Sequence, residues 1–210
     1  MDAEVFRAWI AAVARLVDEQ RDHLTQLDAA IGDADHGINL ARGFTAVLGA
    51  LDSAAPATPG AVLTVTGSTL ISKVGGASGP LYGVAFRRAG KALGDVAEVD
   101  LPALASALQA ALAGVQQLGA AREGDKTMVD ALAPATEAFS KAIVEGASPG
   151  DALSALAQAA REGATATISM QALKGRASYL GPRSVGHEDP GAASTALILG
   201  ALRDVVLAGQ

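Results

Sequence analysis

The chain has 210 residues, of which half are hydrophobic and only 3% aromatic, and its 16 basic and 22 acidic residues give a net charge of −6. This acidic balance argues against a nucleic-acid partner, and the absence of cysteine excludes disulfides and thiolate metal sites. The uncharged stretch 101–121 carries glutamines and a proline, and the N-terminus lacks the layout of a signal peptide, so we expect a cytoplasmic protein without membrane segments.

The apolar pattern predicts helices along nearly the whole chain. In the first, residues 3–27, apolar side chains recur every three or four positions with one gap. Residues 61–73 contain valines and threonines that favour a strand locally, and we assign them to a helix because their neighbours are helical. The other predicted helices cover residues 38–51, 81–93, 101–118, 126–144 with a kink at Pro134, 149–162, 164–173 and 191–208.

About eight helices joined mostly by short loops predict an all-α fold, an antiparallel up-and-down barrel or bundle, in a single domain over residues 1–210. In such a bundle, alternate loops gather at the same end. We therefore expect four loops to meet in one site: the acidic loop after residue 27, and residues 75–80, 119–127 and 175–191.

The acidic loop places Asp28, Asp33 and Asp35 within eight residues. Helical spacing from Val17 and Leu24 puts Asp28 on or beside the inward face of its helix. Clustered carboxylates repel one another, and oxygen ligands select a hard cation, so we interpret the loop as a Mg²⁺ site that also binds a phosphate compound. Capping of a turn explains one or two of these aspartates. An EF-hand is excluded, because its twelfth position would be Phe44 instead of glutamate.

The other three loops carry residues suited to an anion. The glycines of residues 75–79, with Ser78, precede a helix whose N-terminal amides can bind phosphate, although such a loop is also an ordinary turn. Residues 119–127 differ from a Walker A motif by one extra residue and follow a helix, so we reject that motif and leave Lys126 either facing a phosphate or solvated. Arg176 offers a fork of donors to phosphate oxygens, and Tyr179 either packs against a base or plugs the bundle.

Over its whole length the chain resembles the nucleotide-binding L subunit of dihydroxyacetone kinases. The resemblance rests on five ordered motifs: GDADHGIN at residues 32–39, GGASGP at 75–80, GDKTM at 124–128, GRASYLG at 175–181 and HEDPGAAS at 187–194. It implies an eight-helix barrel with the nucleotide across one end and two Mg²⁺ ions on Asp28, Asp33 and Asp35. It also implies that the nucleotide site is lined by His36, Gly37, Ile38, Asn39, Ala77, Ser78, Gly119, Met128, Arg176, Asp189, Pro190 and Gly191.

The activity implied by this resemblance is phosphoryl transfer from Mg-bound ATP to dihydroxyacetone, with Arg176 as the catalytic residue at the transferring group. In the family, a separate K subunit holds dihydroxyacetone, and in the phosphotransferase-system form a phosphohistidine on an M subunit recharges ADP, which stays bound as a coenzyme. We therefore expect an ADP/ATP-binding subunit that is active only with its K and M partners. Two alternatives stay open: an L subunit of a related ketose or ketotetrose kinase, and a regulator that binds a transcription factor according to its nucleotide state.

Overall fold

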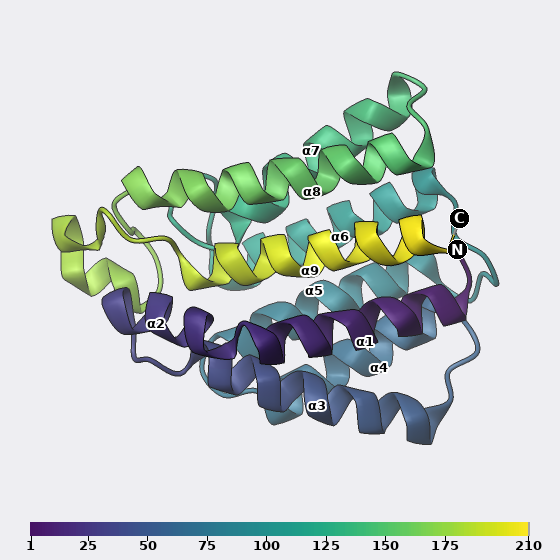
Figure 1. The fold of residues 1–210 in the computed structure, drawn as a ribbon, viewed down its shortest axis with the longest axis horizontal. Helices are drawn as coiled ribbons and strands as arrows, with labels where there is room; N and C mark the ends of the chain where they lie inside the picture. Colours follow the sequence, from purple (N-terminus) through teal and green to yellow (C-terminus); the bar gives the residue numbers. More distant parts are fainter. Residues whose placement is uncertain (210) are drawn as a thin grey trace.

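The computed structural model describes residues 1–209, and over this range the chain forms nine α-helices and two short 3₁₀ segments, with no strand (Figure 1). This confirms the all-α prediction. In chain order the elements are α1 (Ala3–Glu19), α2 (Arg21–Ile31), α3 (His36–Ala54), α4 (Pro59–Lys73), α5 (Ser78–Leu93), α6 (Leu101–Gly119), α7 (Val129–Val144), α8 (Pro149–Ala166), η1 (Thr167–Ser169), η2 (Arg176–Ser184) and α9 (Pro190–Ala208).

Several helices begin with a polar cap followed by proline in the first turn, as the sequence indicates. The side chains of Asp100 and Ser148 accept the amides of Ala103 and Asp151 at the starts of α6 and α8. Each cap satisfies one of the unpaired amides of a helix N-terminus, and proline has no amide to satisfy there. The ambiguous segment, residues 61–73, lies within α4 and is helical.

The structure corrects two of the predicted helices. The helix expected over residues 3–27 is divided at Gln20 into α1 and α2, at the gap in the apolar pattern. The break expected at Gly163 does not occur: α8 continues to Ala166, and only η1 follows. A side chain at Gly163 would collide with the backbone of Asp130 on α7, so this glycine permits a close helix crossing and does not end a helix.

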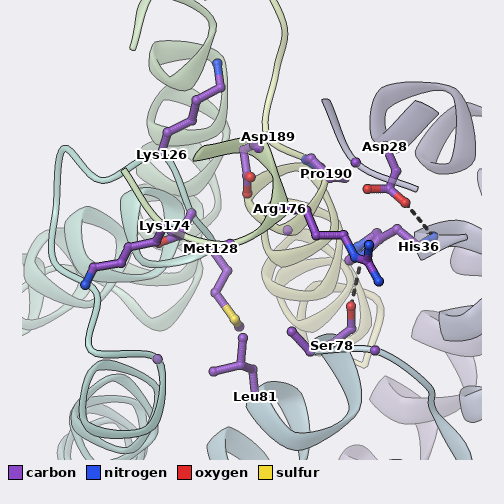
Figure 2. Close-up of a pocket in the computed structure, with 18 of the residues that line it drawn as sticks. Asp28, His36, Ser78, Leu81, Lys126, Met128, Lys174, Arg176, Asp189 and Pro190 are labelled. Atoms are coloured by element: carbon purple, nitrogen blue, oxygen red, sulfur yellow. Dashed lines mark hydrogen bonds between the residues drawn. The ribbon is translucent and has the colours of Figure 1, made fainter. Parts of the chain in front are cut away.

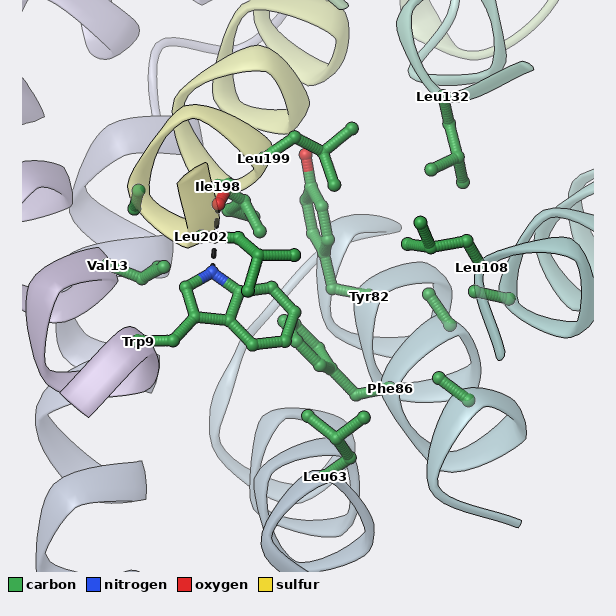
Figure 3. Close-up of a cluster of buried hydrophobic side chains, with 14 of the residues drawn as sticks. Trp9, Val13, Leu63, Tyr82, Phe86, Leu108, Leu132, Ile198, Leu199 and Leu202 are labelled. Carbon is green, nitrogen blue, oxygen red and sulfur yellow. Dashed lines mark hydrogen bonds between the residues drawn. The ribbon is translucent and has the colours of Figure 1, made fainter. Parts of the chain in front are cut away.

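The helices pack side by side around one apolar core, so that α1 contacts both α3 and α9 while α4 and α5 lie against each other (Figure 1). Trp9 is central: its ring contacts Phe6 and Phe86 with centroids 5.8 Å apart in both pairs, and its indole Nε1 donates to the carbonyl of Ile198 at 2.9 Å (Figure 3). Burial of these rings and of the surrounding alanine and leucine side chains supplies the main stabilisation of the bundle.

The helix α9 is the one element of the described chain that is long and apolar enough to cross a membrane. It packs against α8 and α1 inside the bundle, and its polar Ser194 and Thr195 are buried against other parts of the protein. These contacts are those of a core helix. The start of α1 and the end of α9 lie at one end of the bundle, opposite α2 (Figure 1).

Candidate functional site

The four chemistry-bearing loops meet at one end of the bundle around a cavity of about 290 Å³ (Figure 2). The helices α3, α5, α7 and α9 all begin at residues on or next to its wall. Because the N-terminus of a helix carries a partial positive charge and unpaired amides, four such ends favour an anion in the cavity. The N-terminus of α5 has no side-chain cap, which leaves the amides of its first turn available.

The three aspartates converge on this cavity. One carboxylate oxygen from each of Asp28, Asp33 and Asp35 lies within 4.8 Å of the other two. Asp28 is only 8% exposed, and its Oδ2 accepts the backbone amides of Asp35 at 2.8 Å and His36 at 3.2 Å. The predicted inward position of Asp28 is therefore correct, and its hydrogen bonds fold the acidic loop back onto α2.

A tight turn brings the aspartates together. Any side chain at Gly32 would collide with the Asp28 carboxylate, and Ala34 adopts a left-handed backbone with φ of 61°. A left-handed residue that is not glycine is uncommon and costs about 1 kcal/mol. This strained turn places Asp33 and Asp35 on the same side as Asp28.

Arg176 lines the cavity next to the aspartates, and its Nε lies 3.0 Å from Asp33 Oδ2. The guanidinium is largely exposed, so this ion pair is weakly held and the group is free to meet an anionic ligand. In Figure 2 it points toward Ser78 and His36. Arg176 and the acidic loop together form the charged side of the site.

A buried hydrogen-bond network stands behind the charged side. His36 Nδ1 lies 3.1 Å from Ser78 Oγ, and His36 Nε2 lies 2.8 Å from Ser194 Oγ. The hydroxyl of Tyr82 in turn lies 2.6 Å from Ser194 Oγ and 3.0 Å from Thr195 Oγ1. Burial lowers the pKa of His36 to about 4 and raises the pKa of Tyr82 to about 12, so both groups are neutral at pH 7. The network fixes Ser78 at the cavity without adding charge.

The other side of the cavity is apolar. The side chains of Leu81 and Met128 lie next to each other there, with Gly119 and Ala121 nearby (Figure 2). Such side chains suit a flat aromatic ring packed against them, because a thioether and a branched aliphatic group contact a ring without demanding hydrogen bonds. The cavity therefore has one end suited to a base and one end suited to phosphates.

The start of α9 forms the floor of the cavity through Asp189, Pro190 and Gly191. Asp189 caps the helix by accepting the amide of Ala192 at 2.7 Å. Its pKa is raised to about 7, chiefly by burial and also by the nearby Asp130 carboxylate, while hydrogen bonds from backbone amides and the Lys126 charge act to lower it. Asp189 therefore caps α9 and also carries a carboxyl group whose pKa lies near neutral pH.

In the loop that resembles Walker A, two of the backbone amides are bonded within the protein. The amides of Gly124 and Thr127 donate to the Asp130 carboxylate, the latter at 2.7 Å. Lys126 is not solvated: it lines the cavity but is 1% exposed, and its ammonium donates to three backbone carbonyls. The solvated alternative for this lysine is therefore wrong, while the rejection of the Walker motif agrees with the geometry.

Comparison with known proteins decides the family. The model of the DAK2 domain matches residues 30–204.

The chain belongs to the DAK2 domain family.

Two relatives show how this DAK2 domain occurs in longer and shorter chains. It is 42% identical over 191 residues to the ADP-binding subunit DhaL of the PEP-dependent dihydroxyacetone kinase of Escherichia coli (strain K12), covering 91% of each chain. It is 37% identical over 204 residues to a D-erythrulose kinase of Mycolicibacterium smegmatis, covering 96% of this chain and 35% of that protein. The resemblance to dihydroxyacetone kinase L subunits and the expected enzyme class, a phosphotransferase, are thereby confirmed.

Among solved structures, the dihydroxyacetone kinase of C. freundii in complex with AMP-PNP and Mg²⁺ matches with a TM-score of 0.72 and 27% identity. The match covers 97% of this chain and 34% of that one, so the chain spans about a third of the length of this structure. The native form of the same kinase gives a TM-score of 0.73 at 26% identity. The predicted helical architecture is therefore that of a known kinase fold.

Most of the residues predicted for the nucleotide site of this DAK2 domain line the cavity, and three do not. Gly37 is buried against the backbone of Arg21, where any side chain would collide, and so permits the close approach of α2 and α3. Ile38 is 51% exposed, and Asn39 accepts a hydrogen bond from Arg42 at 2.8 Å. Those on the wall are Asp28, Asp33, Asp35, His36, Ala77, Ser78, Gly119, Met128, Arg176, Asp189, Pro190 and Gly191.

Sequence reasoning missed several residues of the DAK2 domain's cavity. Leu81, Tyr82 and Lys174 line it as well, and Ser194 supports it from behind. Only position gave a signal for them: Leu81 and Tyr82 follow the glycine-rich loop by one helical turn, and Lys174 directly precedes the motif of Arg176. Tyr179, expected on a base or inside the bundle, is 88% exposed and does neither.

Proposed function

We propose that this chain is the ADP/ATP-binding subunit of a dihydroxyacetone kinase, which transfers a phosphoryl group from Mg-bound nucleotide to dihydroxyacetone held on a separate K subunit. The observation that carries the proposal is the joining, in one cavity, of three clustered carboxylates with Arg176 and Ser78 on one side and an apolar slot on the other. The name of the Escherichia coli relative, an ADP-binding subunit, supports the same assignment.

The residues present fit a pair of Mg²⁺ ions. Asp28, Asp33 and Asp35 supply only oxygen ligands, and their oxygens are close enough to share cations. Two Mg²⁺ ions bound there would neutralise both the carboxylates and the polyphosphate and so favour attack on the terminal phosphorus. That the C. freundii structure holds Mg²⁺ and AMP-PNP together supports this choice of metal.

The remaining residues have roles that follow from where they lie. Leu81 and Met128 hold the base, so that the phosphates extend toward Ser78 and the free amides at the start of α5. Arg176 then exchanges its contact with Asp33 for the transferring phosphoryl group, whose charge it stabilises during transfer. No side chain of this site is needed as a general base, since positioning and charge neutralisation account for most of phosphoryl-transfer catalysis.

A partner must bring the acceptor to the cavity, and the surface around the cavity suits a protein contact. Large apolar side chains are exposed at this end of the bundle, on η2 and on the segments beside it. A contiguous exposed apolar patch bordered by charge is typical of an interaction site, and we propose that these side chains form one. The exposed side chains are Ile38, Leu118, Ile168, Leu173, Tyr179 and Val185.

We further propose that ADP stays bound as a coenzyme and is recharged in place by a phosphohistidine on an M subunit, and that the chain acts in the cytoplasm as one L domain. Relatives of similar length are ADP-binding subunits of PEP- or PTS-dependent kinases, which supports this donor. The main alternative is a subunit acting on a ketotetrose, and the likeness to a D-erythrulose kinase favours that second reading.

Transfer between purified subunits tests the proposal. The chain is loaded with [γ-³²P]ATP and Mg²⁺, freed of excess nucleotide, and mixed with a K subunit that carries either dihydroxyacetone or D-erythrulose. We expect labelled triose phosphate from the first mixture, ADP left on this chain, and no transfer when EDTA precedes mixing. Faster labelling of erythrulose would support the ketotetrose alternative, and label that never leaves the nucleotide with either acceptor would refute the kinase role.

A further inference from the structure

Lys126 occupies an unusual position for a lysine at the edge of a nucleotide site. It lies in the loop between α6 and α7, with a left-handed backbone at φ of 61°. Its Nζ donates to the carbonyls of Thr167 at 2.7 Å and Met170 at 3.1 Å, and also to the carbonyl of His187. An ammonium has three donors, so all of them are used. In Figure 2 the ammonium points away from Met128 and Arg176.

The three carbonyls belong to two separate segments, which are also joined directly by the amide of Gly186 donating to the carbonyl of Ile168 at 2.7 Å. Thr167 and Met170 lie in and just after η1, and His187 directly precedes the start of α9. Further bonds join the same three stretches: the amide of Asp189 donates to Thr167 Oγ1 at 2.9 Å, and the amide of Leu173 donates to the carbonyl of Asp125 at 3.0 Å. One of these segments leads into the Arg176 loop and the other into the cavity floor.

We propose that Lys126 is a positioning residue, which fixes the wall made by the Arg176 loop and the start of α9 by joining their backbones, and that it never contacts a phosphate. The inference rests on the proposed nucleotide site and adds a residue that acts on the site through others. Burial lowers the pKa of the ammonium, as expected for a group whose surroundings are protein and not water.

A lysine that contacts a phosphate and a lysine that only holds backbone segments in place have different effects on the affinities for ADP and ATP. A lysine that contacts the terminal phosphate contributes more to binding ATP than to binding ADP. A lysine that positions the wall affects the terminal phosphate only through Arg176, so once Arg176 is removed it contributes equally to both nucleotides through the start of α9. The ratio of the two affinities therefore separates the two roles.

The test measures Mg-dependent ADP and AMP-PNP affinity of the full chain by calorimetry, in Arg176→Ala and in the double variant Arg176→Ala/Lys126→Met, so that no difference arises through Arg176. We expect the added Lys126→Met change to lower both affinities by the same factor, about tenfold, since methionine keeps the stem but leaves three buried carbonyls without a donor. Arg176→Ala alone, compared with the wild type, should weaken AMP-PNP more than ADP. A larger loss of AMP-PNP on adding Lys126→Met, or two affinities unchanged within twofold, would overturn the inference.

Thr167→Val provides a second variant if Lys126→Met does not fold. Valine has nearly the shape of threonine but cannot accept the Asp189 amide, so it weakens the same junction without removing a charge. In the Arg176→Ala background the inference requires the same equal loss for ADP and AMP-PNP, and unchanged affinities would contradict it. Failure of the proposed function itself would appear differently, as a wild type that binds neither nucleotide.

Discussion

Asp33→Ala removes the most exposed of the three clustered carboxylates and separates metal binding from folding. The Asp33 side chain is 38% exposed, and its recorded partner is Arg176, which is 69% exposed. An ion pair of this kind contributes at most about 1 kcal/mol, and removing one of three like charges also relieves repulsion with Asp28 and Asp35. We therefore expect the free energy of unfolding to change by less than about 1 kcal/mol.

The affinity for ADP, in contrast, should fall strongly in Asp33→Ala. Even a partner that only orients a metal ligand contributes 10- to 100-fold to affinity, so loss of a direct ligand should weaken Mg-dependent ADP binding by more than about 100-fold. Calorimetric titration of ADP gives the affinity, and urea unfolding followed by the fluorescence of the single tryptophan gives the stability.

The control variant is Asp52→Ala, which removes an exposed carboxylate near the other end of α3 and should change neither quantity. Tight Mg-dependent ADP binding in Asp33→Ala would show that the aspartates do not hold the metal. A large loss of stability would instead show that Asp33 is part of the folding of the loop.

Three further predictions concern pH, docking and the core. Burial raises the Asp189 pKa from 3.8 to about 7, so the folded protein loses stability as this carboxyl ionises. In urea unfolding of the free protein, the free energy of unfolding of the wild type relative to Asp189→Asn should fall by up to about 4 kcal/mol as pH rises from 4 to 7. A difference between the two proteins that stays constant with pH would contradict the burial argument. Tyr179→Ser should leave ADP affinity unchanged but lower the rate of transfer to a K subunit about tenfold, whereas Val144→Ser, 87% exposed at the opposite end, should not, and equal rates would exclude this docking surface. Trp9→Phe removes the donor to Ile198 and should lower the free energy of unfolding by about 1–3 kcal/mol, measured by circular dichroism; no change would mean that the bond is replaced.

The helices and the clustering of the acidic loop could be predicted because their signals are local. Apolar spacing and polar caps such as Asp100 and Ser148 depend on residues within one or two turns, so the sequence displays them directly. The inward position of Asp28 followed from the same spacing.

The predictions from sequence were wrong where contacts between residues far apart in the chain determine the local structure. Glycine is a common helix breaker, so the sequence predicts a break at Gly163. In the structure this glycine lies against the backbone of α7, and the residues around it in the sequence give no sign of that contact. Lys126 finds its carbonyl partners more than 40 residues further along the chain, and Ser194 supports His36 across 158 residues. Such roles depend on tertiary packing, and a single sequence offers no direct signal for them.

The most direct test of the account is a calorimetric titration of ADP into the nucleotide-stripped chain, with Mg²⁺ and again with EDTA. The account predicts tight binding with Mg²⁺ and loss of that binding with EDTA, because the three aspartates repel the phosphates unless cations lie between them. Binding of equal strength in both conditions would contradict the metal site, and absence of binding in both would contradict the nucleotide site itself.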